Sequence, residues 1–191
     1  MIATEVASPF LSPLKLTFYA SLFISLPYVL FEIWGFVAPG MYKKEKTFSL
    51  SIGISSVLLF YTGIVFAYYL VFPLMFGFFT TTGPADITIM TDISKYLDFI
   101  LNIFLAFAIA FEMPVLIFLL NWTGITSPKS LSEKRPYVIV SCFILGMLLT
   151  PPDIISQTLL ALPAWFLFEV GLLLSRIFIK NSSETQDQES N

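Results

Sequence analysis

Apolar residues occur along this chain in five long runs rather than in the short alternation of a half-buried strand. The runs are 13–36, 48–79, 96–121, 137–150 and 154–174. A helix that crosses a bilayer needs about 20 apolar residues, so these runs predict five transmembrane helices. The second run is longer than a bilayer requires, and we expect its outer end, past Pro73, to kink or to project from the membrane. Only Pro151-Pro152-Asp153 separates the last two runs, which predicts a tight hairpin of two short helices.

The composition supports the same fold class. Hydrophobic residues make up 57% of the 191-residue chain and charged residues only 12%, whereas soluble domains carry about 25% charged residues. The sequence therefore predicts an all-α integral membrane protein with a single transmembrane domain over 1–180. Segment 181–191 is polar and acidic, and we expect it to be a disordered tail.

The basic residues predict the orientation. Of the ten Lys and Arg residues, all except Lys15 and Lys95 follow the first, third or fifth run, so they share one face of the membrane. The positive-inside rule assigns that face to the cytoplasm, and the C-terminal tail lies there. The N-terminus would then lie outside, although no signal peptide precedes it. We expect from this that sequence is missing upstream.

Several kinds of chemistry are excluded by what the chain lacks. It has no histidine and a single cysteine, Cys142, which excludes histidine metal sites, Ser-His-Asp triads and internal disulfides. No glycine is followed by lysine, so the phosphate-binding loop of many ATPases is missing. We expect no enzyme activity, no catalytic residue, no cofactor, no metal and no nucleic-acid partner.

One acid interrupts the third run. Glu112 lies near the bilayer centre, about 13 Å from the end of its helix, and an acid there must face protein or water. Pro114 leaves the carbonyl of Ala110 without a donor and predicts a kink beside the acid. Asp98, Asn102 and Glu112 share one helical face, which we expect to line a groove or contact partner helices. A packing role, with Glu112 bonded to a helix of its own chain, stays open.

Two other polar residues are ambiguous from local sequence. Gln157, between Ser156 and Thr158, lies near the outer end of the last run. It could form hydrogen bonds across helices either within its own chain or with a partner. Glu45, among the lysines of the first basic loop, could equally be a solvated loop acid.

Six short segments then occur in a recognisable order. They are IATEVASPF at 2–10, FVAP at 36–39, YKKE at 42–45, FEMP at 111–114, KRPY at 134–137 and LTPPD at 149–153. Together they resemble the TatC family, the multi-spanning subunit of the twin-arginine protein translocase. The resemblance extends from Ile2 to about Phe178.

This resemblance implies a concave helical bundle with two short C-terminal helices and a receptor for signal peptides that carry paired arginines. It implies TatA-type and TatB-type single-span partners and a homo-oligomeric assembly in the bacterial cytoplasmic (inner) membrane. This assembly would move folded proteins outward using the proton-motive force. The family has six spans, so the resemblance also implies that the N-terminal segment and first transmembrane helix are absent here.

The resemblance also implies roles for particular residues. Two match positions that contribute to signal-peptide binding, Phe36 and Glu45. Four match the region that docks partner helices, namely Glu112, Met147, Thr150 and Gln157. Two match outer-face acids with less defined roles, Asp92 and Asp153.

A proton-coupled small-solute transporter is the alternative function, with Glu112 as its titrating group. A transporter would enclose a polar cavity at mid-depth, whereas a receptor would expose Glu112 on an open face toward lipid. An intramembrane hydrolase using Glu112 and Asp98 is discounted, because these residues lie about 21 Å apart along one helix.

Overall fold

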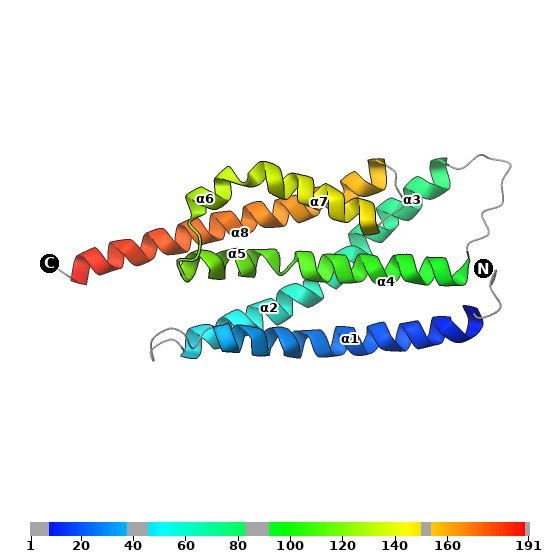
Figure 1. Ribbon diagram of the computed structural model, residues 1–191, viewed down its shortest axis with the longest axis horizontal. Coiled ribbons are helices and arrows are strands. Elements are labelled where there is room, and N and C mark those ends of the chain that lie inside the picture. Colours follow the sequence, from blue (N-terminus) through cyan, green and yellow to red (C-terminus); the bar gives the residue numbers. More distant parts are fainter. Residues whose placement is uncertain (1–7, 38–45, 83–91, 150–153, 190–191) are drawn as a thin grey trace. The chain divides into compact units, whose positions relative to one another are not determined.

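The computed structural model describes residues 8–37, 46–82, 92–149 and 154–189, and its regular elements there are helices (Figure 1). In chain order they are α1 (Ser8–Val37), α2 (Lys46–Phe66), the π-helical turn η2 (Ala67–Val71), α3 (Phe72–Thr82), α4 (Ile93–Ala110), α5 (Met113–Trp122), α6 (Pro128–Glu133), α7 (Arg135–Leu149) and α8 (Ile154–Glu189). The chain forms two compact units, Met1–Ile109 and Ala110–Asn191. The prediction of one domain over 1–180 did not include this division, which falls just before Pro114.

Four helical stretches in the described residues are long and apolar enough to cross a membrane, and a fifth apolar helix is shorter. The long stretches are Pro9–Gly35, Leu50–Phe78, Ile93–Trp122 and Gln157–Ile177, and the shorter one is Arg135–Leu148. The all-α membrane fold predicted from the five apolar runs is therefore confirmed.

The last helix extends beyond the run that predicted it. α8 continues to Glu189, whereas the sequence predicted a span ending near Leu174 and disorder from residue 181. The chain after Gly171 contains neither proline nor glycine, so no residue there is of a type that strongly disfavours a helix. The polar composition of this tail determines where the apolar span ends, but it does not end the helix.

A π-helical turn interrupts the second span. Pro73 has no N–H, and its ring would crowd the carbonyl of Tyr69 in a regular α-helix. The wider turn at Ala67–Val71 lies just before this proline, as expected where the regular hydrogen-bond ladder must adjust. The irregularity therefore precedes Pro73, whereas the sequence predicted it beyond the proline.

In the first unit, α1 packs along α2, and α2 approaches α4 closely at Gly63. The Trp34 indole N–H donates to the Ser56 hydroxyl at 2.8 Å, which links α1 to α2 at a fully buried serine. Gly63 of α2 lies against the backbone of α4, where an added Cβ would be 2.6 Å from the Phe107 carbonyl oxygen. The rings of Phe66 and Phe107 meet beside this contact, with centroids 5.5 Å apart.

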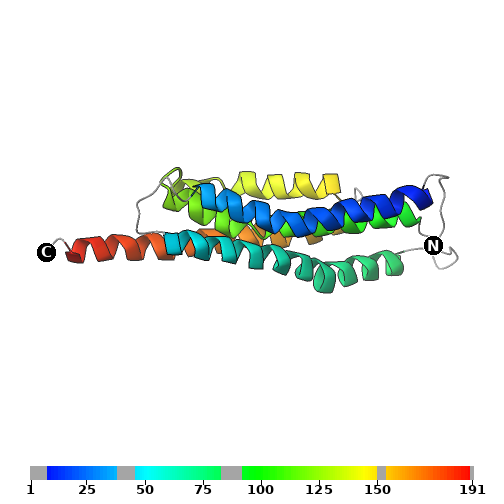
Figure 2. The same cartoon turned by 90° about the horizontal axis from the view of Figure 1, so that it is seen from below.

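In the second unit, α8 contacts α5, α6 and α7, and α7 lies beside α8 in both views (Figures 1 and 2). The core of this unit is a cluster of Ile117, Phe168 and Leu172. Gly171 allows α8 to approach α5 closely, because a Cβ there would lie 2.8 Å from the Cα of Pro114. The helix that carries the predicted docking residue Gln157 is thus also the packing centre of its unit.

Exposed hydroxyl groups in the spans are satisfied by their own helices. The hydroxyls of Thr62, Ser141 and Thr158 each donate to the carbonyl four residues earlier, at 2.7, 2.8 and 2.6 Å. Lipid offers no hydrogen-bond partner, so these bonds are what allow such residues on an exposed helix face.

Replacement of Gly171 by valine should destabilise the second unit. The new side chain would meet backbone atoms of α5, and overpacking of this kind costs about 1–3 kcal/mol of unfolding free energy. The matched control is Gly77→Val in α3, where an added Cβ has nothing within 4 Å. Thermal unfolding in detergent would measure both variants, and equal losses would contradict the close approach at Gly171.

Candidate functional site

Glu112 lies at the break between α4 and α5. Because Pro114 has no N–H to donate to the carbonyl of Ala110, α4 ends at Ala110 and α5 begins at Met113. This is where the sequence predicted the kink. The Leu116 N–H donates to the Glu112 carbonyl at 3.0 Å, so the helix restarts from the acid itself.

The carboxyl group of Glu112 is buried. The residue is 7% exposed, and its side chain does not cap the first turn of α5. The acid therefore faces protein rather than lipid, which is one of the two environments that the sequence allowed. The open, lipid-facing position expected of a receptor is not what the burial shows.

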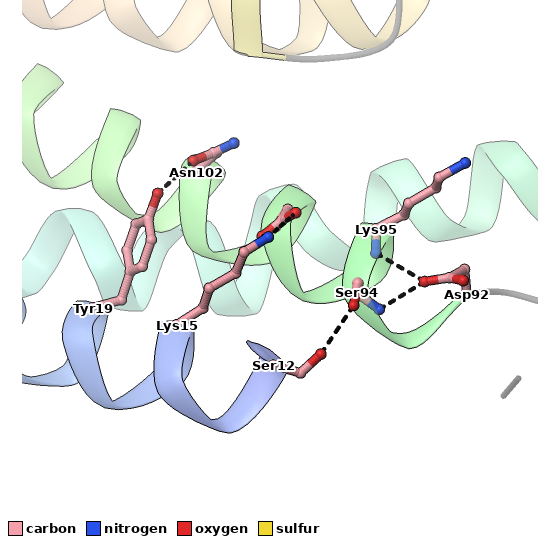
Figure 3. A network of polar contacts seen from close by, with 8 residues as sticks. Ser12, Lys15, Tyr19, Asp92, Ser94, Lys95 and Asn102 are labelled. Atoms are coloured by element: carbon pink, nitrogen blue, oxygen red, sulfur yellow. Dashed lines mark hydrogen bonds and ion pairs between the residues drawn. The ribbon is translucent and has the colours of Figure 1, made fainter. Parts of the chain in front are cut away.

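The other polar residues of the predicted stripe contact α1. Lys15 Nζ donates to both carboxylate oxygens of Asp98, at 2.9 and 2.8 Å. The Tyr19 hydroxyl donates to Asn102 Oδ1 at 2.9 Å (Figure 3). We expected this face to line a groove or contact partner helices, but Asp98 and Asn102 form these bonds inside the chain. The reason is register, since each pair of residues is four apart on its helix and successive turns therefore meet.

Asp92 caps the start of α4. Its carboxylate Oδ1 accepts the backbone N–H of Ser94 at 2.8 Å and that of Lys95 at 3.3 Å (Figure 3), as an N-cap residue does. The Ser94 hydroxyl lies 3.0 Å from the Ser12 hydroxyl of α1. Asp92 therefore fixes the end of α4 at which the polar contacts with α1 begin.

Gln157 joins α8 to α7. Its side-chain amide donates to the carbonyl of Phe143 at 2.8 Å, and an added Cβ at Gly146 would lie 3.2 Å from Gln157 Cγ. Met147, the next residue of α7, is 52% exposed. Gln157 thus forms a hydrogen bond within its own chain, which is one of the two alternatives that the sequence left open. Met147 presents an apolar side chain on the surface of the same hairpin.

Four predicted site residues have no described side chain. Phe36 lies in the last turn of α1, and only its backbone is described. Three lie outside the described residues, namely Glu45, Thr150 and Asp153. Among the residues that are described, the structure brings together Met147 and Gln157 on one helical hairpin and places Asp92 at the start of α4.

An ion pair within the second unit was not predicted from the sequence. Arg135 at the start of α7 donates to Glu169 Oε2 of α8 at 2.8 Å, and the Glu169 side chain is 19% exposed. Glu169 is an acid inside an apolar run, which is a signal that a partner is needed. Its partner lies 34 residues away, so local sequence could not identify it.

Known proteins match this chain over nearly its whole length. The sequence model of the family Sec-independent protein translocase protein (TatC) matches residues 1–163. The TatC protein of Haemophilus influenzae is 55% identical over 97% of this chain and 76% of its own length. The TatC protein of Escherichia coli K12 is 54% identical over 94% of this chain and 69% of its own length.

A solved structure has the same fold. The crystal structure described as the twin arginine translocase receptor TatC superposes with a TM-score of 0.85 and 31% identity. It covers 93% of this chain, which covers 78% of that protein. These matches agree with the multi-pass membrane fold, and they do not support the small-solute transporter considered as the alternative. The chain belongs to the TatC family and is a subunit of the Sec-independent protein translocase.

Proposed function

We propose that this chain is the subunit that receives twin-arginine signal peptides and docks TatA-type and TatB-type single-span partners. The likeness to a solved twin-arginine translocase receptor carries this proposal. The translocase would move folded proteins across the bacterial inner membrane, and several copies of the chain would assemble within it. The basic residues that follow the first, third and fifth apolar runs support a cytoplasmic C-terminus. No ATP-binding loop occurs in the sequence, which agrees with the proton-motive force as the energy source.

The signal-peptide site includes Phe36, in the last turn of α1, and Glu45, which immediately precedes α2 in the sequence. Trp34, two residues before Phe36, is bonded to Ser56 of α2, which holds the end of α1 against its neighbour. Lys43, Lys44 and Lys46 surround Glu45 and would repel an arginine pair. A carboxylate among them supplies the opposite charge and can accept two hydrogen bonds from one guanidinium. Glu45 thus attracts the paired arginines, although the neighbouring lysines repel them.

Partner helices dock on the α7–α8 hairpin, where Met147 is exposed and Gln157 holds the two helices together. Thr150, three residues after Met147 in the sequence, is assigned to the same docking surface. Transmembrane helices associate through close packing and interhelical hydrogen bonds, so a flexible thioether and nearby polar groups suit such a surface. Asp153 follows Thr150 in the sequence as a second proposed outer-face acid, and Asp92 contributes by capping α4 rather than by touching a partner.

Glu112 contributes to docking from the helix break. Its carboxyl is buried, but it lies where Pro114 has already interrupted the regular hydrogen bonding of the helix. A local opening at this break therefore disrupts less structure than it would in a continuous helix. A partner helix with a polar group could then bond the acid, and the bilayer around it would strengthen the preference for a bonded state.

Glu112→Ala should weaken retention of a single-span partner about threefold to tenfold, the size expected for one interhelical hydrogen bond in a membrane. Glu112→Gln keeps a donor and an acceptor and should retain most of the partner. Glu32→Ala, at an exposed acid of α1, is the control. Co-purification from detergent-solubilised membranes measures the effect. Unchanged retention in Glu112→Ala, with a normal melting curve, would remove the acid from the docking site.

Glu45→Ala should lower crosslinking of a twin-arginine signal peptide by about tenfold or more, the loss expected for a charge-assisted hydrogen bond. Glu45→Gln should lose nearly as much, because the amide lacks the charge. Glu133→Ala removes an acid from the loop after the third run and should leave crosslinking unchanged. Site-specific photo-crosslinking in translocase-containing membranes provides the readout, and equal yields in Glu45→Ala and the unmodified chain would refute the loop assignment.

A further inference from the structure

An open pocket lies in the second unit where α6 meets α8. Its volume is about 610 Å³, and it is lined by Ser127, Pro128, Lys129, Ser132, Glu133 and Arg176. This volume falls within the roughly 300–1,000 Å³ of typical small-molecule sites. None of these residues belongs to the proposed signal-peptide or partner-docking regions.

Two cations meet at this pocket. Lys129 comes from α6 and Arg176 from α8, and among the described residues neither has an ion-pair partner. Lys15 and Arg135, in contrast, are held by Asp98 and Glu169. Glu133 contributes one negative charge to the lining, so the pocket carries a net positive charge. A pocket with unpaired cations and an open mouth suits an anionic ligand.

The position of the pocket indicates which anion. Arg176 lies in the last turn of the span Gln157–Ile177, so its guanidinium is at the depth of the lipid head groups. Phosphate groups are the anions concentrated at that depth, and basic pockets at the ends of membrane helices bind anionic head groups. A twin-arginine signal peptide is cationic and would be repelled here.

The side chains present match a phosphate group. Arginine can hold two phosphate oxygens with its planar fork, and lysine adds a compact positive charge. The Ser127 hydroxyl oxygen accepts the Ser130 N–H at 3.2 Å, which leaves its own O–H hydrogen to donate. Ser132 supplies a second hydroxyl donor.

We propose that this pocket binds a phosphate-ester anion, supplied by the head group of an anionic phospholipid. Arg176 and Lys129 hold the phosphate, the two serines donate to its oxygens, and Glu133 opposes it. The acyl chains would then extend along the apolar surface of α8, where Leu173 and Ile177 are exposed.

Native mass spectrometry of the detergent-purified chain tests this proposal with phosphatidylglycerol as the anionic probe and phosphatidylcholine as the zwitterionic one. Each neutralised cation should lower phosphatidylglycerol affinity about fivefold, so Lys129→Gln with Arg176→Gln should lower it roughly 25-fold. Lys134→Gln removes an exposed cation of the same loop that does not line the pocket. It should change affinity less than twofold. Glu133→Gln should raise affinity, a gain that misfolding cannot produce.

Inorganic phosphate distinguishes the two sources of the anion. Phosphatidylglycerol binding that resists inorganic phosphate and disappears in the double variant supports the lipid head group. Inorganic phosphate binding to the unmodified chain but not to the double variant supports the same pocket with a soluble phosphate as ligand. Equal losses in Lys134→Gln and the double variant, or an unchanged affinity in the double variant, would overturn the proposal.

Discussion

Polar groups within the depth of the bilayer must find their partners in protein or water, because lipid supplies none, and this constraint shapes the structure. Lipid tails neither donate nor accept hydrogen bonds, so each unsatisfied group costs several kcal/mol. Exposed hydroxyls in the spans bond to their own helices. Larger polar groups use neighbouring helices, as Asp98 does with Lys15 and Glu169 with Arg135. The packing of helices in each unit thus follows from pairing polar groups as well as from filling space.

Proline places the irregular backbone in two of the spans. Pro73 follows the π-helical turn in the second span, and Pro114 follows the break in the third. In both cases a missing N–H interrupts the regular bonding of a helix that is otherwise continuous. The break at Pro114 also positions Glu112, a buried acid of the third span. A residue that is unable to donate a hydrogen bond therefore determines where a titratable group can be buried.

Much of the fold could be predicted because apolar run length and helix length are tied by the thickness of the bilayer. The break beside Glu112 was also predictable, since Pro114 acts on a carbonyl four residues away. The pairing of polar side chains between helices was harder to predict from the sequence. Asp98 and Asn102 were expected to face a groove or partner, because nothing in their own run shows that α1 presents Lys15 and Tyr19 at matching turns. The helical conformation after residue 180 was not predicted, because a polar composition indicates that a segment is solvated but does not determine its backbone conformation.

The three links between α1 and α4 have a mechanical consequence. The linked residues follow the same order along both helices, so α1 and α4 run parallel. The pairs are Ser12 with Ser94, Lys15 with Asp98, and Tyr19 with Asn102. An axial slide of α1 by one turn, about 5.4 Å, would separate all three side-chain pairs at once. The three links therefore oppose axial sliding of α1 along α4 together rather than one at a time.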